Sequence, residues 1–283
     1  MSDDYQHIEL EPNKESVGAE IRGLDLKKDL SPEAAREIVQ ATGQFGMTYF
    51  RDQELTPEEH LDFARSIGEI NINRFFGAVQ GYPEIAEVRK EPDQDFNIGG
   101  GWHTDHSYDE IPALGSILLA RTVPDRGGDT LFANMYAAYE ALSSGLKETL
   151  STLRAVHSSR HVFGQTSQMP SDLKGRLGNA EKAVQDTDHP VVIIHPTSGR
   201  KALYVNPGFT IKFKGWSKEE SRVLLEYLYK HAARPEFTYR FQWHEGSLAF
   251  WDNRCTWHYA LNDYHGQRRL MHRITLAGCA LSD

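Results

Sequence analysis

The chain contains little cysteine and no long apolar segment. Of its 283 residues only Cys255 and Cys279 are cysteines, which excludes a disulfide framework and indicates a reducing cytoplasm. No apolar run approaches the roughly 18 residues that a membrane-spanning helix needs. Residues 1–11 are polar and acidic, unlike the basic and then apolar pattern of a secretory signal. We therefore expect a soluble cytoplasmic protein with no membrane partner.

Positive charge is also scarce. Lys and Arg number 31 against 40 Asp and Glu, which gives a formal net charge of -9 at pH 7. Nucleic-acid binding requires a surplus of positive charge against the phosphates, so we expect no nucleic-acid partner. Small anions are not excluded, because a local pair of arginines can override the average field of the protein.

Apolar and aromatic residues are sufficient for a large core. Hydrophobic residues make up 39% of the chain and aromatic residues 11%, and there is no repeat, low-complexity tract or clear linker. Strand-like segments are concentrated in the C-terminal half. We predict one domain over residues 1–283, mainly β with surrounding helices, as an antiparallel barrel or jelly roll. The polar stretch over about 163–186 indicates a lid-like excursion.

Local signals give the positions of several elements. Helices are expected to begin after Ser31, Thr56 and Ser217, because each of these N-cap residues precedes an acidic first turn. A further helix is expected over residues 135–153. Strands are predicted at 17–21, 47–50, 113–120, 190–194, 202–205, 237–243, 247–251 and 270–278.

A pattern of histidine and carboxylate is the main chemical signal. His103 and Asp105 are two residues apart, so on a strand both side chains project to one side while Thr104 faces away. His258 follows a turn at Asp252-Asn253 and offers a third ligand from far along the chain. Two imidazoles and one carboxylate hold non-haem Fe(II) on one face and leave the other positions open. We predict that His103, Asp105 and His258 bind such an iron, with O2 as a co-reactant.

Two arginines near the C-terminus predict the binding of organic acids. Arg269, Met271 and Arg273 share one face of a predicted strand. If this face points into the barrel, each guanidinium needs an anionic partner, because an unpaired buried charge is strongly unfavourable. A dicarboxylate bound beside the metal would be such a partner, held by the two-pronged guanidinium.

Four motifs follow one another along the chain. They are Trp102-His103-Thr104-Asp105, Gly127-Gly128-Asp129-Thr130, Trp251-Asp252-Asn253-Arg254 with His258, and Gln267-Arg268-Arg269-Leu270-Met271-His272-Arg273. In this order they resemble the taurine dioxygenase (TauD/TfdA) family of Fe(II)- and 2-oxoglutarate-dependent oxygenases, and the resemblance covers about residues 21–278. It implies a double-stranded β-helix, a cupin-like jelly roll, and a homo-oligomer that is a dimer or tetramer. It also implies His103, Asp105 and His258 as iron ligands, and Arg269 with Thr130 as partners of the distal carboxylate of 2-oxoglutarate.

The predicted substrate pocket differs from that of taurine-type members of the family. Those members have a His and a Tyr after a Gly-Glu pair, and an Asn before the Trp-His motif, at the polar ends of the substrate. This chain has Asn73, Phe76 and Gly99 at those places, while Arg273 resembles the arginine that binds the substrate's anionic head. We expect a substrate bulkier or more aromatic than taurine. The candidate substrate-binding residues are Arg273, Asn73, Phe76, Tyr108, Phe163 and Phe209.

Together these features predict a dioxygenase that hydroxylates a small anionic organic substrate and forms succinate and CO2. The substrate classes are a sulfonate, an alkyl sulfate or a carboxylate, including taurine-like compounds. One alternative is an aryloxyalkanoate-type dioxygenase that cleaves an ether-linked acid, since residues 85–89 and 99–101 resemble members of that type. A second alternative is a non-catalytic, metal-containing β-barrel binding protein, which a fourth protein ligand on the metal would favour.

Other histidines and one cysteine give weaker signals. His157 and His161 have the i, i+4 spacing of metal ligands on a helix, but the glutamate of a metalloprotease helix does not follow His157. His106, next to the iron motif, is expected behind the ligands or at the pocket rim. Cys255 lacks a base-orienting context, so we expect a buried structural thiol.

Overall fold

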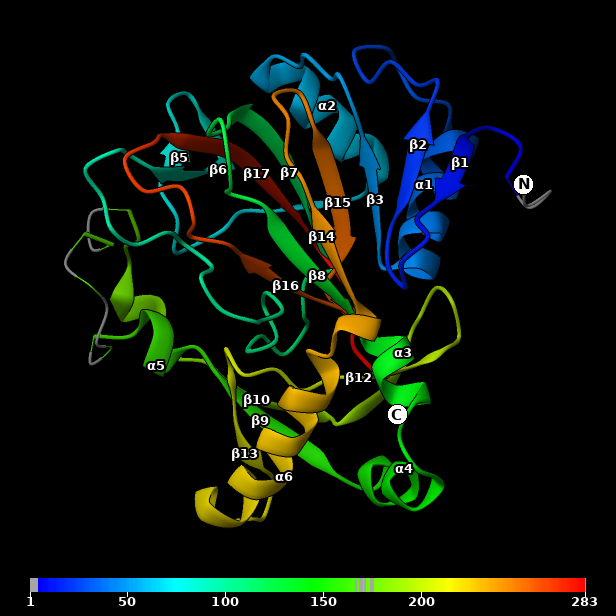
Figure 1. The fold of residues 1–283 in the computed structure, drawn as a ribbon, viewed down its shortest axis with the longest axis vertical. Coiled ribbons are helices and arrows are strands. Elements are labelled where there is room, and N and C mark those ends of the chain that lie inside the picture. The colour runs from blue at the N-terminus through cyan, green and yellow to red at the C-terminus, as the bar shows by residue number, and fades with distance from the viewer. Residues whose placement is uncertain (1–4, 166, 168–169, 171, 174–175, 283) are drawn as a thin grey trace.

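The computed structural model describes residues 5–165, 167, 170, 172–173 and 176–282. Strands predominate over helices, as the sequence predicts (Figure 1). The strands are β1 (Glu9–Pro12), β2 (Ala19–Arg22), β3 (Met47–Phe50), β4 (Ile70–Asn71), β5 (Ala78–Val79), β6 (Tyr82–Lys90), β7 (Gly115–Thr122), β8 (Thr130–Asn134), β9 (Arg154–Ser158), β10 (Asp186–Pro190), β11 (Val192–Ile194), β12 (Lys201–Leu203), β13 (Thr210–Phe213), β14 (Thr238–Phe241), β15 (Leu248–Asp252), β16 (Thr256–Ala260) and β17 (Arg269–Leu276). The helices are α1 (Pro32–Phe45), α2 (Pro57–Ile67), α3 (Met135–Glu140), α4 (Ser144–Ser151), α5 (Arg160–Phe163) and α6 (Lys218–Ala232), with 3-10 turns η1 (Ala180–Lys182) and η2 (Pro235–Phe237).

Two sheets packed against each other form the predicted jelly roll. The larger has nine strands in the order β1-β2-β3-β15-β7-β17-β6-β5, with β4 paired to β17, and the smaller has the order β14-β8-β16. An apolar cluster that includes Met47, Leu118, Phe132, Trp251 and Met271 joins them. Figure 1 shows the smaller sheet crossing in front of β7, β15 and β17. The two sheets therefore enclose an interior toward which side chains of both can project.

Helices α1 and α2 cover the outer face of the larger sheet. Their apolar residues, among them Ile38 and Phe63, join a buried cluster with Phe50, Phe250 and Ile274. Helix α2 begins at a complete capping box, in which the Thr56 side chain accepts from the Glu59 amide and the Glu59 side chain accepts from the Thr56 amide. The predicted starts of α1 and α6, at Ser31 and Ser217, are confirmed as well. These capping signals are local, so the sequence alone is sufficient to find them.

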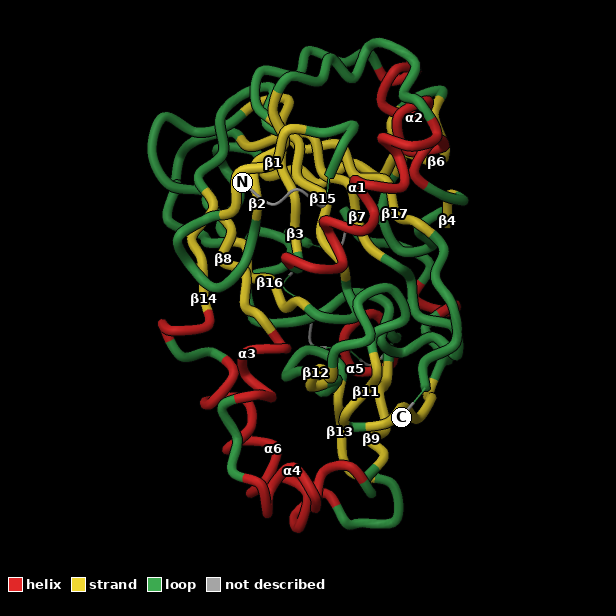
Figure 2. The backbone as a smooth tube through the Cα atoms, turned by 90° about the vertical axis from the view of Figure 1, so that its right-hand side faces the viewer, coloured by secondary structure: helices red, strands yellow, loops and turns green. Residues whose placement is uncertain are grey.

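The remaining helices and strands form the other end of the molecule. Helices α3 and α6 pack with the β11–β12 hairpin around a third cluster that contains Tyr136, Leu228 and Trp257. Figure 2 shows α4 and α6 at the end opposite to α2. The three-stranded sheet β10-β9-β13 lies beside them. This end contributes the strands and turns that close one side of the cavity described below.

Two expectations about secondary structure are corrected by the structure. The helix predicted over residues 135–153 is interrupted: α3 ends at Glu140, and α4 starts anew with Ser143 as its N-cap, whose hydroxyl accepts from the Leu146 amide. The segment with His103 and Asp105 is not a strand of the sheets either. His103 forms a single bridge to His258, and the chain then enters a turn in which His106 has a φ of 57°.

Part of the predicted excursion over residues 163–186 lies outside the described residues. In its described part, Phe76 forms a β-bridge with Leu177, and the Gly178 amide donates to the Phe75 carbonyl (2.8 Å). Arg176 is buried and donates to three carbonyls, those of Arg89 (2.7 Å), Phe96 (2.5 Å) and Asp172 (3.1 Å). The excursion is thus tied to β6 and to the loop before His103.

The described residues include no helix that is both long enough and apolar enough to cross a membrane.

Candidate active site

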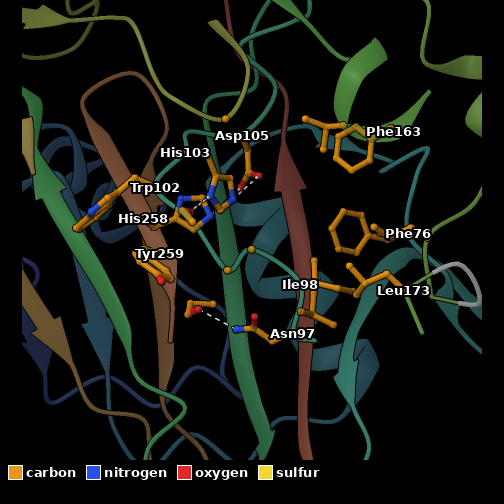
Figure 3. Close-up of a pocket in the computed structure, with 18 of the residues that line it drawn as sticks. Phe76, Asn97, Ile98, Trp102, His103, Asp105, Phe163, Leu173, His258 and Tyr259 are labelled. Carbon is orange, nitrogen blue, oxygen red and sulfur yellow. Dashed lines mark hydrogen bonds and ion pairs between the residues drawn. The ribbon is translucent and has the colours of Figure 1, made fainter. Parts of the chain in front are cut away.

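All eleven site residues predicted from the sequence line one cavity. Its volume is about 1020 Å3. The cavity lies on the inner side of the jelly roll, and Figure 3 shows side chains converging on it from several segments. These residues are His103, Asp105, His258, Arg269, Thr130, Arg273, Asn73, Phe76, Tyr108, Phe163 and Phe209.

A pair of main-chain hydrogen bonds joins the two histidines of the predicted metal site. The His103 amide donates to the His258 carbonyl (3.1 Å), and the His258 amide donates to the His103 carbonyl (2.8 Å). We call this pair the backbone clasp. The Thr104 hydroxyl, which faces away as predicted, donates to the Asn253 carbonyl (2.5 Å) and fixes the motif to the turn before β16. Two segments far apart in sequence therefore present their imidazoles side by side, with ring centroids 4.1 Å apart.

The donor atoms of His103, Asp105 and His258 lie within 4.8 Å of one another. Asp105 Oδ1 is 3.7 Å from His103 Nε2, and Asp105 Oδ2 is 3.5 Å from His258 Nε2. Among the described residues this cluster has three candidate ligands and no fourth. Two imidazoles and a carboxylate that line one cavity fit a non-haem Fe(II) ion.

The protonation of these groups suits metal binding. His103 Nδ1 lies 2.7 Å from the Gly101 carbonyl, which can only accept, so Nδ1 carries a proton and Nε2 is the nitrogen that could bind a metal. Burial, and then the nearby His103 and Arg273, lower the pKa of His258 well below its usual value, so this imidazole is neutral. Burial of Asp105 opposes its ionisation, but Arg273 and the histidines outweigh burial and hold its pKa well below the usual range.

Close packing leaves little freedom for the His103 side chain. A Cβ atom placed on Gly208 would come within 2.7 Å of His103 Cβ, so only glycine allows this approach. Phe209, the next residue, places its ring edge-on to the His103 ring, with centroids 6.4 Å apart. The loop between β12 and β13 therefore shapes the wall beside the metal cluster.

Arg269 forms a buried cationic end of the cavity. It is 5% exposed, and its Nε donates to the Gly128 carbonyl (3.0 Å). Its Nη2 has no hydrogen-bond partner among the described residues, and burial lowers the pKa of the guanidinium. Gly128 has a φ of 71°, a conformation that favours glycine, and a Cβ there would be 3.2 Å from Arg269 Cδ. The Gly-Gly turn thus sets the position of this arginine.

Thr130 lies next to this end with its hydroxyl proton free to donate. Its Oγ1 accepts from Trp243 Nε1 (2.9 Å), so the hydroxyl hydrogen can point to an anion in the cavity. The ring of Trp243 also lies 5.8 Å from Arg269 Cζ. Sequence reasoning missed Trp243, although an indole N–H requires an acceptor when it is buried.

Arg273 lies between the metal cluster and the apolar side of the cavity. Its Nη2 is 3.3 Å from Asp105 Oδ2, and its Nε has no hydrogen-bond partner among the described residues. The ring of Phe76 covers the guanidinium, with Cζ 5.2 Å from the ring centroid. The arginine face of β17 therefore points into the interior, as expected.

Aromatic and aliphatic side chains line the cavity from the flank of the metal cluster to the side across from it. Phe209 and Tyr108 pack edge to face with ring centroids 4.8 Å apart, and Phe163 stacks on Phe75 at 4.3 Å. Figure 3 shows Phe76, Phe163, Ile98 and Leu173 on the side of the cavity across from His103 and Asp105. A ligand here would meet a charged end and a long apolar surface.

Asn73 lies in the cavity wall, but its carboxamide is already engaged. Its Oδ1 accepts from the amides of Phe75 (2.9 Å) and Phe76 (3.2 Å), and its Nδ2 faces His106 Nε2 at 3.4 Å. His106 in turn contacts Asp109 through Nδ1 (2.9 Å) and is buried behind the ligands.

The weaker sequence signals give no second metal site at His157 and His161 among the described residues, although His161 lines the cavity. His157, on β9, is buried and contacts Thr210 Oγ1 (3.2 Å), while His161 faces the Gly208 carbonyl (2.9 Å). Cys255 is buried as expected, and burial raises the pKa of its thiol, which disfavours a nucleophile. His195, Asp252 and Cys255 also lie close together, but the guanidinium of Arg254 binds both carboxylate oxygens of Asp252.

Asn97 is a second residue that sequence reasoning missed. Its Nδ2 donates to the Ala260 carbonyl (2.8 Å), which joins the loop before His103 to the end of β16 (Figure 3). Nothing in the loop's polar composition distinguishes Asn97 from its neighbours, because its acceptor is far away in sequence.

Comparisons with known proteins agree with this geometry. The family described as "Taurine catabolism dioxygenase TauD, TfdA family" matches residues 9–275. An alkylsulfatase of Acinetobacter baylyi is 36% identical over 277 residues, 96% of this chain and 86% of the relative. An alpha-ketoglutarate-dependent sulfate ester dioxygenase of Pseudomonas putida is 35% identical over 274 residues, 96% of this chain and 90% of the relative. A crystal structure of a putative alpha-ketoglutarate-dependent taurine dioxygenase from Burkholderia xenovorans superposes with a TM-score of 0.82 at 38% identity, covering 97% of this chain and 94% of that one.

Proposed function

The chain belongs to the TauD/TfdA family of Fe(II)- and 2-oxoglutarate-dependent dioxygenases, and from this premise we propose that it cleaves the sulfate ester of an apolar alcohol. Membership in this family makes it an oxygenase that consumes O2 and 2-oxoglutarate and acts on an anionic organic substrate. The alternative of a non-catalytic binding protein is therefore set aside. The sulfate ester and the role of each residue are our proposal.

We propose that His103, Asp105 and His258 hold the iron. Each imidazole would supply one nitrogen lone pair, and the ionised Asp105 would neutralise one of the two metal charges. When bound together, Fe(II), 2-oxoglutarate and O2 supply the oxidising power, and 2-oxoglutarate becomes succinate and CO2. The chain's own contribution is to hold the reactants in place and to keep water out.

Arg269 and Thr130 would hold the far carboxylate of 2-oxoglutarate. The unpartnered Nη2 of Arg269 and the free hydroxyl proton of Thr130 are donors on the same side of the cavity. A buried guanidinium with an open donor is unfavourable unless an anion completes it. A dicarboxylate meets this need at one end while its other end reaches the metal cluster.

The observation that carries the sulfate ester is the guanidinium of Arg273, which lines the cavity beside the metal cluster and an apolar wall, and whose Nε has no hydrogen-bond partner among the described residues. This arginine would hold the anionic head, and Phe76, Phe163 and Phe209 would hold the organic part. The relatives of Acinetobacter baylyi and Pseudomonas putida carry names that refer to sulfate esters, which supports this choice. An ether-linked aryloxy acid, the second candidate, is favoured by the aromatic wall and by the resemblance of residues 85–89 and 99–101, and a relative of Burkholderia sp. that is 32% identical carries a name that refers to such an acid.

The proposed reaction breaks the ester by oxidation of carbon. The C–H bond next to the ester oxygen is replaced by C–OH, with one oxygen atom from O2 entering the substrate and the other entering succinate. The resulting hemiacetal-like sulfate loses hydrogen sulfate as its O–H becomes a carbonyl. The organic product is an aldehyde or ketone. Arg273, near the departing group, would stabilise the negative charge on the sulfate oxygens.

The test is a panel of anions assayed for substrate-dependent succinate release. Butyl, hexyl, octyl and phenethyl sulfates are compared with hexanesulfonate, taurine and phenoxyacetate. We expect the alkyl sulfates to give the highest kcat/KM and to release inorganic sulfate and succinate in a 1:1 ratio. Turnover of phenoxyacetate or taurine without turnover of any sulfate would refute the sulfate-ester proposal and leave the dioxygenase assignment intact.

Arg273→Gln provides the matched variant for this assay. The substitution removes the charge but keeps a polar, shorter side chain, so we expect a higher KM for hexyl sulfate. Uncoupled turnover of 2-oxoglutarate should change little, because Arg269 is intact. Equal loss of both activities would show that Arg273 does not act on the substrate anion.

We further propose that the enzyme works in the cytoplasm as a single-domain subunit of a dimer or tetramer. Its two cysteines are unpaired, one buried and one exposed, as suits a reducing compartment. The oligomer rests on the family resemblance, and light scattering of the purified protein tests it: a monomer at micromolar concentration would contradict it.

A further inference from the structure

Both polar atoms of the Asn73 side chain, at a position aligned with a substrate-binding residue, already contact other groups of the protein. Its Oδ1 accepts two backbone amides and its Nδ2 faces His106. An asparagine that accepts from the amides two and three residues further on forms an Asx-type turn, which fixes the backbone of those residues. What this turn fixes here is Phe76.

Phe76 is held from both sides. Through the turn it is bound to Asn73, and through its backbone it pairs with Leu177 of the excursion. The preceding residue, Phe75, is buried and accepts from the Gly178 amide (2.8 Å). The Phe76 ring therefore has a defined place over the guanidinium of Arg273.

The ring matters because Arg273 has a competing partner. Its Nη2 is 3.3 Å from Asp105 Oδ2, an oxygen that the metal also needs. A ring over the guanidinium restricts the plane of this group and so limits how far the guanidinium can turn toward Asp105. Without the ring, the guanidinium is free to turn toward Asp105, where the ion pair is stronger than in water.

The support behind Asn73 is itself fixed. His106 Nδ1 is 2.9 Å from the Asp109 carboxylate, and Arg74 forms an ion pair with the same carboxylate. The His189 side chain contacts the Asp109 carbonyl (2.9 Å). Contacts thus run from Asp109 through His106 to Asn73, and Asn73 connects them through Phe76 to Arg273.

We propose that Asn73 is a positioning residue for substrate specificity: its carboxamide holds the turn that keeps Phe76 over Arg273, and so directs Arg273 to the substrate anion and away from Asp105. This inference rests on the role of Arg273 given under the proposed function. It assigns Asn73 no contact with the substrate and no effect on 2-oxoglutarate.

The first experiment needs no substrate. Full-length protein labelled with 15N-arginine is examined by NMR, and the Arg273 Nε resonance is assigned by its absence in Arg273→Lys. Phe76→Leu, which keeps apolar bulk but lacks a ring, defines the resonance without ring current. We expect Asn73→Ala to shift the resonance toward the Phe76→Leu position, and Asn73→Ser, whose hydroxyl can still accept from the turn amides, to stay near the wild-type position.

The second experiment is a double-mutant cycle on anion binding. The affinity of the anaerobic metal- and 2-oxoglutarate-bound enzyme for hexyl sulfate is measured by calorimetry for Asn73→Ala, Phe76→Leu and the double variant. Because a cation–π contact contributes modestly, each single change should weaken binding by about 3- to 30-fold. The double variant should bind like Phe76→Leu alone, since Asn73 acts through that ring. The KM for 2-oxoglutarate should stay within about twofold of wild type.

Each outcome decides the proposal. An unchanged Arg273 resonance in Asn73→Ala, or losses of affinity that add in the double variant, would overturn it and indicate a direct contact between Asn73 and the substrate. If Asn73→Ala does not fold, Asn73→Ser takes its place, and an Arg273 resonance at the Phe76→Leu position in a folded Asn73→Ser protein would also overturn it. If the wild-type enzyme binds no sulfate ester, the proposed function fails, while the NMR experiment still tests the coupling of Asn73 to Arg273.

Discussion

Replacement of Arg269 by methionine tests whether this arginine binds the co-substrate or stabilises the fold. Arg269 is buried, keeps one bond from Nε to the Gly128 carbonyl, and has an unpartnered Nη2 among the described residues. In the ligand-free protein such a charge lowers the free energy of unfolding, because burial removes the water around the guanidinium and no anion takes its place. We therefore expect Arg269→Met to keep the ligand-free free energy of unfolding or to raise it, by up to about 4 kcal/mol.

The ligand-bound state should respond in the opposite sense. Removal of a charged partner from a buried hydrogen-bonded pair costs about 2–5 kcal/mol, which corresponds to a roughly 30- to 5,000-fold weaker affinity for 2-oxoglutarate. Wild-type protein should gain about 2.7 kcal/mol of stability at a ligand concentration of 100 times Kd. Arg269→Met should gain almost nothing at the same concentration.

Arg176→Met is the matched control. Arg176 is 8% exposed and Arg269 is 5% exposed, but the guanidinium of Arg176 donates to three carbonyl groups. Its removal leaves these acceptors without a donor, so the ligand-free protein should lose about 2–5 kcal/mol. Binding of 2-oxoglutarate should still raise the free energy of unfolding of the Arg176→Met protein.

The assay is urea unfolding followed by tryptophan fluorescence. It is performed without oxygen and with Mn2+ in place of iron, in the presence and absence of 2-oxoglutarate. A large loss of ligand-free stability in Arg269→Met, together with an undiminished stabilisation by 2-oxoglutarate, would refute the assignment of Arg269 to the co-substrate.

Two further predictions concern the metal and pH. His103→Ala should weaken Fe(II) binding by more than the roughly 10- to 100-fold loss of metal affinity that follows mutation of residues hydrogen-bonded to the ligands. Bound metal is measured after anaerobic dialysis. The control His161→Ala, in the same cavity, should retain the metal, and equal metal contents in the two variants would contradict the ligand assignment. Burial lowers the pKa of His60 to about 3 and that of His272 to about 4, so both are neutral when folded and take up protons on unfolding below about pH 6.5. Above pH 6.5 the two histidines should not lower the free energy of unfolding. Below it, this free energy should fall by about 1.4 kcal/mol per pH unit for each histidine as the pH drops toward 4. Urea unfolding at pH 7, 6 and 5 measures this slope, and an equally steep slope in His60→Leu would contradict the reasoning.

Much of the fold could be predicted because its signals are local. The helix starts at Ser31, Thr56 and Ser217 depend on residues within one turn, and all three are confirmed. Strands such as β8 and β16 escaped prediction. Their residues lie almost wholly inside the molecule, so they lack the alternation that identifies a half-exposed strand. The helix over 135–153 was wrong because Ser143 begins a new helix at a site that apolar spacing alone would continue through.

The site was predictable in composition but not in arrangement. Residue types and their spacing indicated His103, Asp105 and His258, and the structure brings their donor atoms together. The expected strand that would aim His103 and Asp105 at one point is a single bridge followed by a turn. Asn73 was identified as a pocket residue, and the two amides that it binds were missed. They could have been inferred, because asparagine at the start of a turn accepts from the amides that follow it. The partners of Trp243 and Asn97 depend on long-range packing and could not.

The backbone clasp between His103 and His258 has a consequence for how such a protein can change over generations. The spacing of these two imidazoles depends on main-chain atoms, which every amino acid except proline supplies in full. Mutations in the aromatic wall can therefore alter which compound enters the cavity while the distance between the two imidazoles is inherited unchanged. Proteins of such a lineage can change the compound that they bind while the arrangement of the two imidazoles is kept.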